Sequence, residues 1–300
     1  MSQALNFVLC PSYHGATLFG LLANNHSAVA HLGDTLPIQR HMDYFCSCQE
    51  RIQDCEFWSE MTELLGTRKF PHEKKIVPVA PRILKSTEQN QRLARTIIKT
   101  QQKLGFSAWT FMPWRVKEFI RVTEDLATHA LRLQNKKVFV DGSKEVYRVM
   151  AYWALAKPDK LRIIHLVRDP RAFVLSSLVN LADRNITPEH AIQIWKNYHN
   201  IPIKFAEENP QVEYLRVRYE DISADPDGEM ARVFNFIGLE PEIVAVAPKQ
   251  PHHLIGNRML LEFDGTVKLD TRWETELSEE TQTTILKSTE ELSKLFGYAE

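Results

Sequence analysis

The sequence has few cysteines for its length and no excess of either charge. Four cysteines in 300 residues are too few for a disulfide-stapled scaffold. The 37 Lys and Arg residues nearly balance the 38 Asp and Glu residues, so the formal net charge is −1. A chain without a strong positive field has no general attraction for nucleic acid or an anionic membrane. We therefore expect no nucleic-acid partner, and we expect any anion site to be local.

Long hydrophobic runs are also missing. No apolar run approaches the roughly 20 residues that a membrane span needs. The first residues carry no basic cluster and lead into a short apolar run that ends at Pro11, which is unlike a signal peptide. We predict a cytoplasmic, globular protein without a membrane span, and its oligomeric state stays open.

Four short apolar runs indicate the fold class. They cover residues 5–10, 137–140, 161–167 and 212–217, and each is followed by a turn or charge and then a helical pattern. This order is typical of βα units around a buried parallel sheet. We therefore predict an α/β fold with a central parallel sheet flanked by helices.

Helix-capping residues and one weakly patterned stretch indicate how the rest of the chain is organised. N-terminal caps followed by proline or acidic residues predict helices that begin after Thr187, Asp225 and Ser278. Gly238 predicts the end of the second of these helices. The pattern is weak between about residues 40 and 85, which indicates an insertion. Without repeats or a Gly/Ser linker, we expect a single domain over residues 1–300.

The loop after the first predicted strand is a candidate phosphate site. Backbone N–H groups and a helix N-terminus converge in a strand, tight loop and helix of this kind. Against the nucleotide-kinase pattern G-x-x-x-x-G-K-[ST], the chain has Cys10, Gly15, Ala16 and Thr17. The phosphate-binding lysine is therefore missing, which disfavours a P-loop kinase.

The third predicted strand carries a more specific motif. It runs into Val-Arg-Asp-Pro-Arg at residues 167–171, and Ser176 follows eight positions after Arg168. This motif resembles the 3′-phosphate-binding motif of the sulfotransferases that use 3′-phosphoadenosine 5′-phosphosulfate (PAPS). Further similar segments follow at residues 141–144, 218–221 and 253–258, and at Asp270 and Trp273. The resemblance covers residue 5 to about residue 297.

The resemblance implies a three-layer architecture like that of P-loop NTPases, with PAPS as the cofactor. A C-terminal segment around residues 240–300 would then cover the cofactor and acceptor. Arg168 and Ser176 would hold the 3′-phosphate, by charge-assisted and hydroxyl contacts. Tyr219 would lie near the adenine, and Asn257 with Arg258 would close over the 3′-phosphate. The 5′-phosphosulfate loop would consist of Ser12, Tyr13, His14, Gly15, Ala16 and Thr17.

The implied reaction moves a sulfuryl group from PAPS to a hydroxyl of an organic acceptor, a small molecule or a carbohydrate. It yields a sulfate ester and 3′-phosphoadenosine 5′-phosphate (PAP). Such a transfer needs positive donors around the sulfonate and requires no metal. Many members of the family place Lys or Arg where this sequence has Tyr13, and a hydroxyl residue at His14 and Ala16. Lys144 and His14 are the candidates to supply the missing cation.

The transfer also needs a base for the hydroxyl proton. In the tyrosylprotein branch of the family, an acidic residue at the distance of Asp34 from the loop is the base, and we predict Asp34. The cytosolic small-molecule branch uses a histidine, so His72 and His129 are alternatives. Because Tyr13 replaces a cation, a catalytically impaired protein that binds PAPS or PAP is the alternative function. A P-loop kinase is a less favoured one.

The cysteines form a cluster in the sequence whose role stays open. Cys46, Cys48 and Cys55, with His41 nearby, are residue types that bind zinc. Their spacing is not a familiar ligand pattern. We therefore favour a short loop with small buried thiols and predict no metal site.

Overall fold

The computed structural model describes most of the chain. The described residues are 4–34, 45–65, 114–144, 146–156, 160–182, 185–245, 253–256 and 259–299. Four of the residues named above, His41, His72, Asn257 and Arg258, lie outside these ranges. So does much of the predicted insertion, of which residues 45–65 are described.

A parallel sheet of five strands forms the centre of the fold, in the order β2-β3-β1-β4-β5. Four strands match the predicted apolar runs closely: β1 (Leu5–Leu9), β3 (Val138–Asp141), β4 (Leu161–Val167) and β5 (Glu213–Arg218). The fifth, β2 (Val29–His31), was not predicted, because three residues are too few to show a pattern. The predicted α/β class is confirmed.

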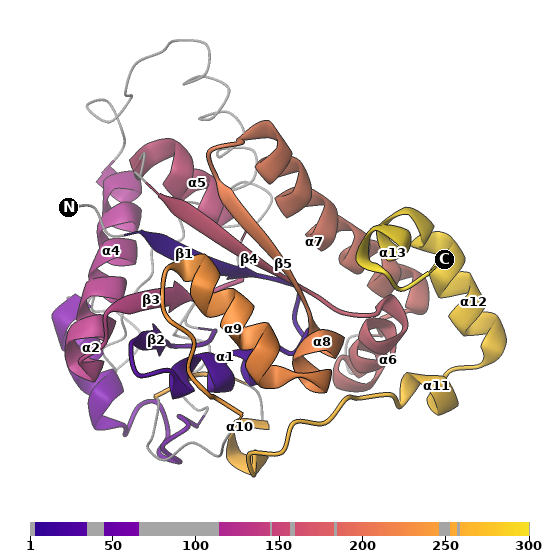
Figure 1. The fold of residues 1–300 in the computed structure, drawn as a ribbon, viewed down its shortest axis with the longest axis horizontal. Coiled ribbons are helices and arrows are strands. Elements are labelled where there is room, and N and C mark those ends of the chain that lie inside the picture. Colours follow the sequence, from indigo (N-terminus) through magenta and orange to yellow (C-terminus); the bar gives the residue numbers. More distant parts are fainter. Residues whose placement is uncertain are drawn as a thin grey trace.

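Helices cover both faces of the sheet (Figure 1). On one face, α1 (Ala16–Asn25) and α9 (Pro226–Ile237) share a core with Val8 of β1. On the other face, α2 (Glu56–Leu65), α4 (Trp114–Gln134) and α5 (Val146–Ala156) share a core with Phe7 and Leu9. Successive residues of β1 thus face opposite apolar layers, as a strand buried on both sides requires.

The C-terminal half adds a third apolar cluster beside the sheet. Here α6 (Pro170–Asn180) and α7 (Pro188–Glu208) pack with α12 (Glu279–Ser288) and α13 (Glu290–Phe296), around Trp195. The described residues also include three short helices: α8 (Tyr219–Ala224), α10 (Met259–Glu262) and α11 (Trp273–Glu276).

The predicted helix ends are confirmed by their caps. The side chains of Thr187, Asp225 and Ser278 each accept a hydrogen bond from a backbone N–H in the first turn of α7, α9 and α12. The α9 helix ends at Gly238, which adopts the left-handed conformation with φ 85°. These local signals act within one helical turn, so the sequence reveals them directly.

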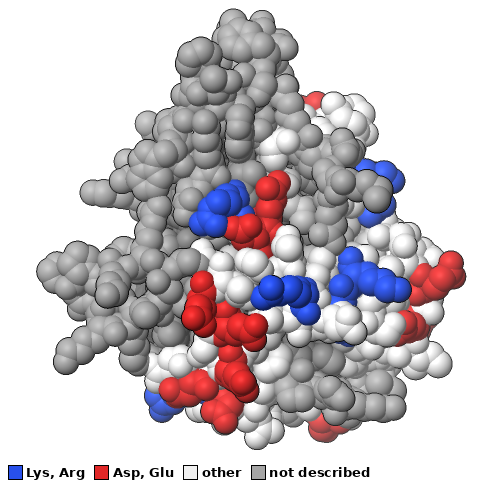
Figure 2. Space-filling model, turned by 90° about the vertical axis from the view of Figure 1, so that its left-hand side faces the viewer, with Lys and Arg blue, Asp and Glu red and all other residues white. Residues whose placement is uncertain are grey.

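The described surface carries charges of both signs. In the view of Figure 2, acidic and basic side chains lie beside one another on the described part of that face, in keeping with the net charge of −1. None of the helices in the described ranges has the length and apolar character to cross a membrane.

The strand order places a crevice between β1 and β4. These strands are neighbours, yet the chain leaves β1 toward β2 at one edge and leaves β4 toward β5 at the other. In open parallel sheets, ligands bind at the carboxyl ends of such a strand pair. The predicted phosphosulfate loop and Arg168 follow these two strands.

Candidate active site

The loop after β1 turns sharply in front of α1. Tyr13 and Gly15 both adopt left-handed conformations, with φ 64° and φ 78°, and Gly15 is the N-cap of α1. A Cβ atom on residue 15 would lie 2.4 Å from Cδ2 of Tyr219. Glycine is therefore needed here both for the backbone conformation and for the close approach of the Tyr219 ring.

Arg168 joins this loop to the segments around it. The guanidinium donates to the carbonyl oxygen of Tyr13 at 2.7 Å and to Oδ2 of Asp270 at 2.9 Å. It also lies 3.5 Å from Oγ of Ser176 and 4.6 Å from the ring centroid of Tyr219. Arg168 is only 6% exposed, and its Nε atom is buried without a hydrogen-bond partner among the described residues.

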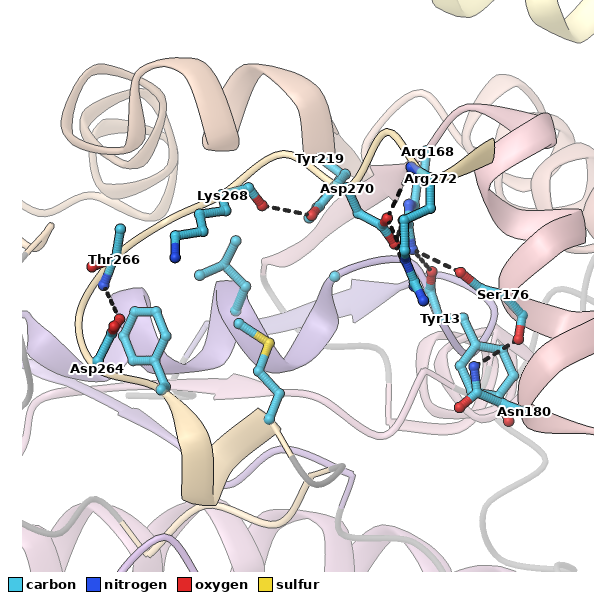
Figure 3. A pocket seen from close by; sticks show the side chains of 14 residues that line it. Tyr13, Arg168, Ser176, Asn180, Tyr219, Asp264, Thr266, Lys268, Asp270 and Arg272 are labelled. Atoms are coloured by element: carbon cyan, nitrogen blue, oxygen red, sulfur yellow. Dashed lines mark hydrogen bonds and ion pairs between the residues drawn. The ribbon is translucent and has the colours of Figure 1, made fainter. Parts of the chain in front are cut away.

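A pocket of about 580 Å³ opens beside Arg168. Five residues predicted to bind the cofactor line it: Tyr13, Gly15, Arg168, Ser176 and Tyr219. The opposite wall comes from the C-terminal segment, residues 259–272, which contributes Lys268 and Arg272 among others. Figure 3 shows Arg168, Arg272 and Asp270 gathered at one end, with Lys268, Thr266 and Asp264 toward the other.

Asp270 is the acidic partner of the two arginines at this end. Its carboxylate accepts from Arg272 at 2.8 and 2.9 Å and from Arg168 at 2.9 Å. The Arg272 hydrogen bonds hold the pKa of Asp270 well below its usual range, Arg168 lowers it further, and partial burial opposes both. Asp270 is therefore a carboxylate at neutral pH, and its negative charge lies next to the guanidinium of Arg168.

The structure brings Asp34 and Lys144 together. Lys144 Nζ lies 3.2 Å from Oδ2 of Asp34, and both side chains are partly buried. Asp34 follows β2 and Lys144 follows β3, so both lie at the carboxyl edge of the sheet. The pair lies close to Cys10 at the end of β1. Burial raises the pKa of the Cys10 thiol to about 12, while Lys144 lowers it and Asp34 raises it.

His14 does not line the pocket, and its surroundings do not favour a cation. It is fully buried, and Nδ1 lies 3.2 Å from the carbonyl oxygen of Ser12 while Nε2 lies 3.0 Å from Nε2 of His199. The chain continues from His199 Nδ1 to His165 Nε2 at 2.8 Å, and from His165 to the Tyr214 hydroxyl.

One set of tautomers satisfies this histidine chain without any charge. Tyr214 donates to His165, His165 to His199, His199 to His14, and His14 to the carbonyl of Ser12. Burial lowers the pKa of His14 and His199 well below 6.5. The expectation that His14 presents a cation to the sulfonate thus finds no support in the geometry. Its buried ring holds the loop instead.

The remaining predicted residues lie elsewhere. Ser12 is exposed, and Ala16 and Thr17 begin α1; none of the three is among the residues that line the pocket. His129 lies near the C-terminal end of α4, which leads into the start of β3. This is the amino edge of the sheet, opposite the pocket, so the structure does not bring His129 to the site.

One wall of the pocket consists of charged residues whose role cannot be predicted from the sequence: Lys268, Asp270 and Arg272. From the sequence, Asp270 is recognisable only as part of a tail similar to that of the family. The charges stand at alternate positions of an extended segment, a pattern common on solvated surfaces. Only the path of residues 263–272 across α1 and α6 shows that these charges line a pocket.

Comparison with known proteins identifies the family. A model of the sulfotransferase family matches residues 61–242, which is more than half of the 300 residues. The chain therefore belongs to the sulfotransferase family. The comparison with curated proteins gives no match.

Two solved structures share the fold. The sulfotransferase domain of the Synechococcus PCC 7002 olefin synthase is 17% identical, with a TM-score of 0.58 over 100% of this chain and 96% of that one. The sulfotransferase domain from the curacin biosynthetic pathway is 16% identical, with a TM-score of 0.52 over 98% of each chain. At this identity the likeness extends to the fold alone.

Proposed function

We propose that the protein transfers a sulfuryl group from PAPS to a hydroxyl of an organic acceptor. The observation that carries the proposal is the buried Arg168 at the β1/β4 crevice, where Ser176 and Tyr219 line the same pocket. Arginine is suited to phosphate because its planar fork donates two parallel hydrogen bonds. The unpartnered Nε of Arg168 leaves a further donor for such a ligand.

The pocket residues fit a nucleotide with an additional phosphate. Arg168 and Ser176 would hold the 3′-phosphate, and the Tyr219 ring would lie beside the base. The loop of residues 12–17 would present backbone N–H groups to the 5′-phosphosulfate. Asn257 and Arg258 stay in the proposal as residues that close over the 3′-phosphate. The bound PAPS would supply the sulfuryl group.

Asp34 and Lys144 are the proposed catalytic residues. The acceptor oxygen forms a bond to sulfur while the bond from sulfur to the phosphate oxygen breaks, so the hydroxyl proton needs an acceptor. Asp34 would take this proton, and its ion pair with Lys144 at 3.2 Å would hold the carboxylate in place at the carboxyl edge of the sheet. Lys144 would supply positive charge near the sulfonate, in the place of the cation that Tyr13 replaces. The transfer itself requires no metal.

Nucleotide selectivity tests the cofactor site. We expect PAP to raise the thermal unfolding midpoint, and 5′-AMP and ATP, which lack the 3′-phosphate, to raise it much less. A ligand at 100 times its dissociation constant adds about 2.7 kcal/mol of stability. Arg168→Ala should remove the preference for PAP over AMP. Arg171→Ala is the matched control, because Arg171 pairs with Asp169 and does not line the pocket. Equal shifts by PAP and AMP in the wild type would refute the site.

Turnover with labelled PAPS tests the base. Asp34→Asn should keep the PAP-induced shift and lose transfer, whereas Asp125→Asn, which removes a carboxylate paired with Arg121 on α4, should keep both. Unchanged turnover in Asp34→Asn would exclude Asp34 as the base.

A second candidate function follows from Tyr13. Because this residue stands where many relatives have Lys or Arg, the protein is alternatively a PAPS- or PAP-binding protein with impaired turnover. A PAP-induced shift without sulfate transfer to any acceptor in a screen of phenols, alcohols and sugars would favour this alternative.

A further inference from the structure

Three cysteines and one histidine meet in a cluster apart from the pocket. The Sγ atoms of Cys46, Cys48 and Cys55 and a ring nitrogen of His253 all lie within 4.8 Å of one another. The cysteines come from the loop before α2, while His253 lies about 200 residues further along the chain. Cys46 and Cys55 are buried, and Cys48 and His253 are partly buried.

The separations match a tetrahedral zinc site. With Zn–S bonds of about 2.3 Å and Zn–N bonds of about 2.0 to 2.1 Å, ligand atoms at tetrahedral angles lie about 3.8 Å (S to S) and about 3.6 Å (S to N) apart. Here His253 Nδ1 lies 3.6 Å from Cys46 Sγ and 3.5 Å from Cys55 Sγ. The Sγ atoms of Cys48 and Cys55 are 3.6 Å apart.

The backbone around the cysteines forms a tight turn. Gln49 N donates to Cys46 O at 2.8 Å and Cys46 N to Glu50 O at 2.7 Å. Gln49 takes φ 75°, the left-handed conformation that reverses the chain just after Cys48. Cys55 N then donates to Arg51 O at 2.9 Å, directly before α2. The three thiols are thus presented by a short hydrogen-bonded loop.

The histidine is held in place by its own neighbours. Its ring stacks on Phe57, with centroids 4.4 Å apart and an interplanar angle of 9°. Leu254, the next residue, donates its N–H to Ser47 Oγ at 2.9 Å, and its carbonyl accepts from Ser47 N at 3.2 Å. Both sides of the cluster are therefore positioned by contacts that do not involve the ligand atoms.

We propose that Cys46, Cys48, Cys55 and His253 bind one Zn²⁺ ion in a structural site. Four protein ligands of the Cys₃His type complete the tetrahedron and leave no open position for water or substrate. The proposal goes beyond sulfuryl transfer, in which the ion has no chemical part. It also replaces the sequence interpretation of metal-free buried thiols. That interpretation considered His41 as the nearest histidine, whereas the structure brings His253 to the three cysteines.

The ion would tie the C-terminal segment to the edge of the sheet beside the active site. Ile255, two residues after His253, pairs with the end of β2: its N–H donates to Leu32 O, and its carbonyl accepts from Asp34 N at 3.0 Å. A Cβ atom on Gly256 would lie 3.0 Å from Thr17 Oγ1. Zinc at the cysteine loop would therefore hold the backbone next to Asp34 and to the start of α1.

Metal analysis of the whole chain tests the proposal. The chain purified with zinc in the medium and dialysed against metal-free buffer should retain one zinc per chain by mass spectrometry. Replacement by Co²⁺ should give thiolate-to-metal charge-transfer bands and the intense visible bands of a tetrahedral ion. Titration of the wild-type thiols with a mercurial should release the zinc to a chromogenic chelator, a readout that needs no variant.

Variants assign the ligands. Cys55→Ser and His253→Asn should each lower retained zinc at least tenfold, whereas Cys10→Ser and His190→Asn, which change residues of the same types outside the cluster, should retain one zinc. If a ligand variant does not fold, the thiol titration of the wild type still shows whether the cysteines hold zinc. A wild-type chain without zinc after loading, with four free thiols or with a Cys48–Cys55 disulfide, would overturn the proposal. So would full zinc retention in both ligand variants.

Discussion

Removing the negative charge of Asp270 should strengthen binding of PAP. Asp270 Oδ2 lies 2.9 Å from Nη2 of Arg168, whose guanidinium is proposed to hold the 3′-phosphate. The carboxylate and a bound phosphate would share this guanidinium and repel each other. Asp270→Asn keeps the shape of the side chain and an oxygen that accepts from Arg168, but it removes the charge.

The size of the effect follows from Coulomb's law. A phosphate oxygen on the same guanidinium would lie about 5 Å from the carboxylate, where two like unit charges repel by about 3 kcal/mol at an effective dielectric constant of about 20. The Asp270 side chain is 25% exposed, so solvent screens part of this repulsion. Taking about half leaves about 1.5 to 2 kcal/mol, or roughly 10- to 30-fold tighter binding of PAP.

Isothermal titration with PAP and with AMP measures this change. The gain should appear for PAP and be small for AMP, since only PAP carries the 3′-phosphate. Asp264→Asn is the control, because Asp264 lines the same pocket but accepts from Thr266 N rather than from an arginine. Without ligand, Asp270→Asn should unfold at a lower temperature, because it loses ion pairs with two arginines. Weaker binding of PAP by this variant would refute the reasoning and show that Asp270 positions Arg168 for the phosphate.

Three further predictions concern the loop and the buried histidines. Gly15→Ala should lower the unfolding midpoint and abolish the PAP-induced shift, because its Cβ would lie 2.4 Å from the Tyr219 ring; an unchanged shift would contradict this packing. Tyr13→Lys should raise the turnover of labelled PAPS by about ten- to a hundredfold if the missing cation limits the rate, and an unchanged rate would exclude that cause. Burial lowers the folded-state pKa of four histidines below 6.5: His14, His31, His165 and His199. The free energy of unfolding should therefore be unaffected by these histidines above about pH 6.5 and should decrease as the pH falls further, by up to about 1.4 kcal/mol per pH unit for each histidine. Scanning fluorimetry between about pH 8 and pH 5 measures this decrease; His199→Gln should reduce its slope, and an unfolding midpoint that does not change with pH would contradict the burial of neutral histidines.

Short-range patterns in the sequence determined the elements of the fold. The apolar runs predict four of the five strands because a strand buried on both faces needs consecutive apolar residues. The caps at Thr187, Asp225 and Ser278 predict helix starts because each cap bonds within its own first turn. Arg168 and Ser176 are visible as a pair because they stand eight residues apart at one strand-to-helix junction. All these signals act over about two helical turns or less.

Only the tertiary structure decided which of these residues meet. Asp270 reaches Arg168 across 102 positions of sequence, and His253 reaches Cys55 across 198. Lys144 pairs with Asp34 because β2 and β3 are neighbours in the sheet. No local sequence pattern indicates this strand order. Burial lowers the pKa of His14, whose ring contacts His199 from α7. Charge state and ligation depend on what surrounds a side chain, and those surroundings come from distant segments that only the packed fold brings together.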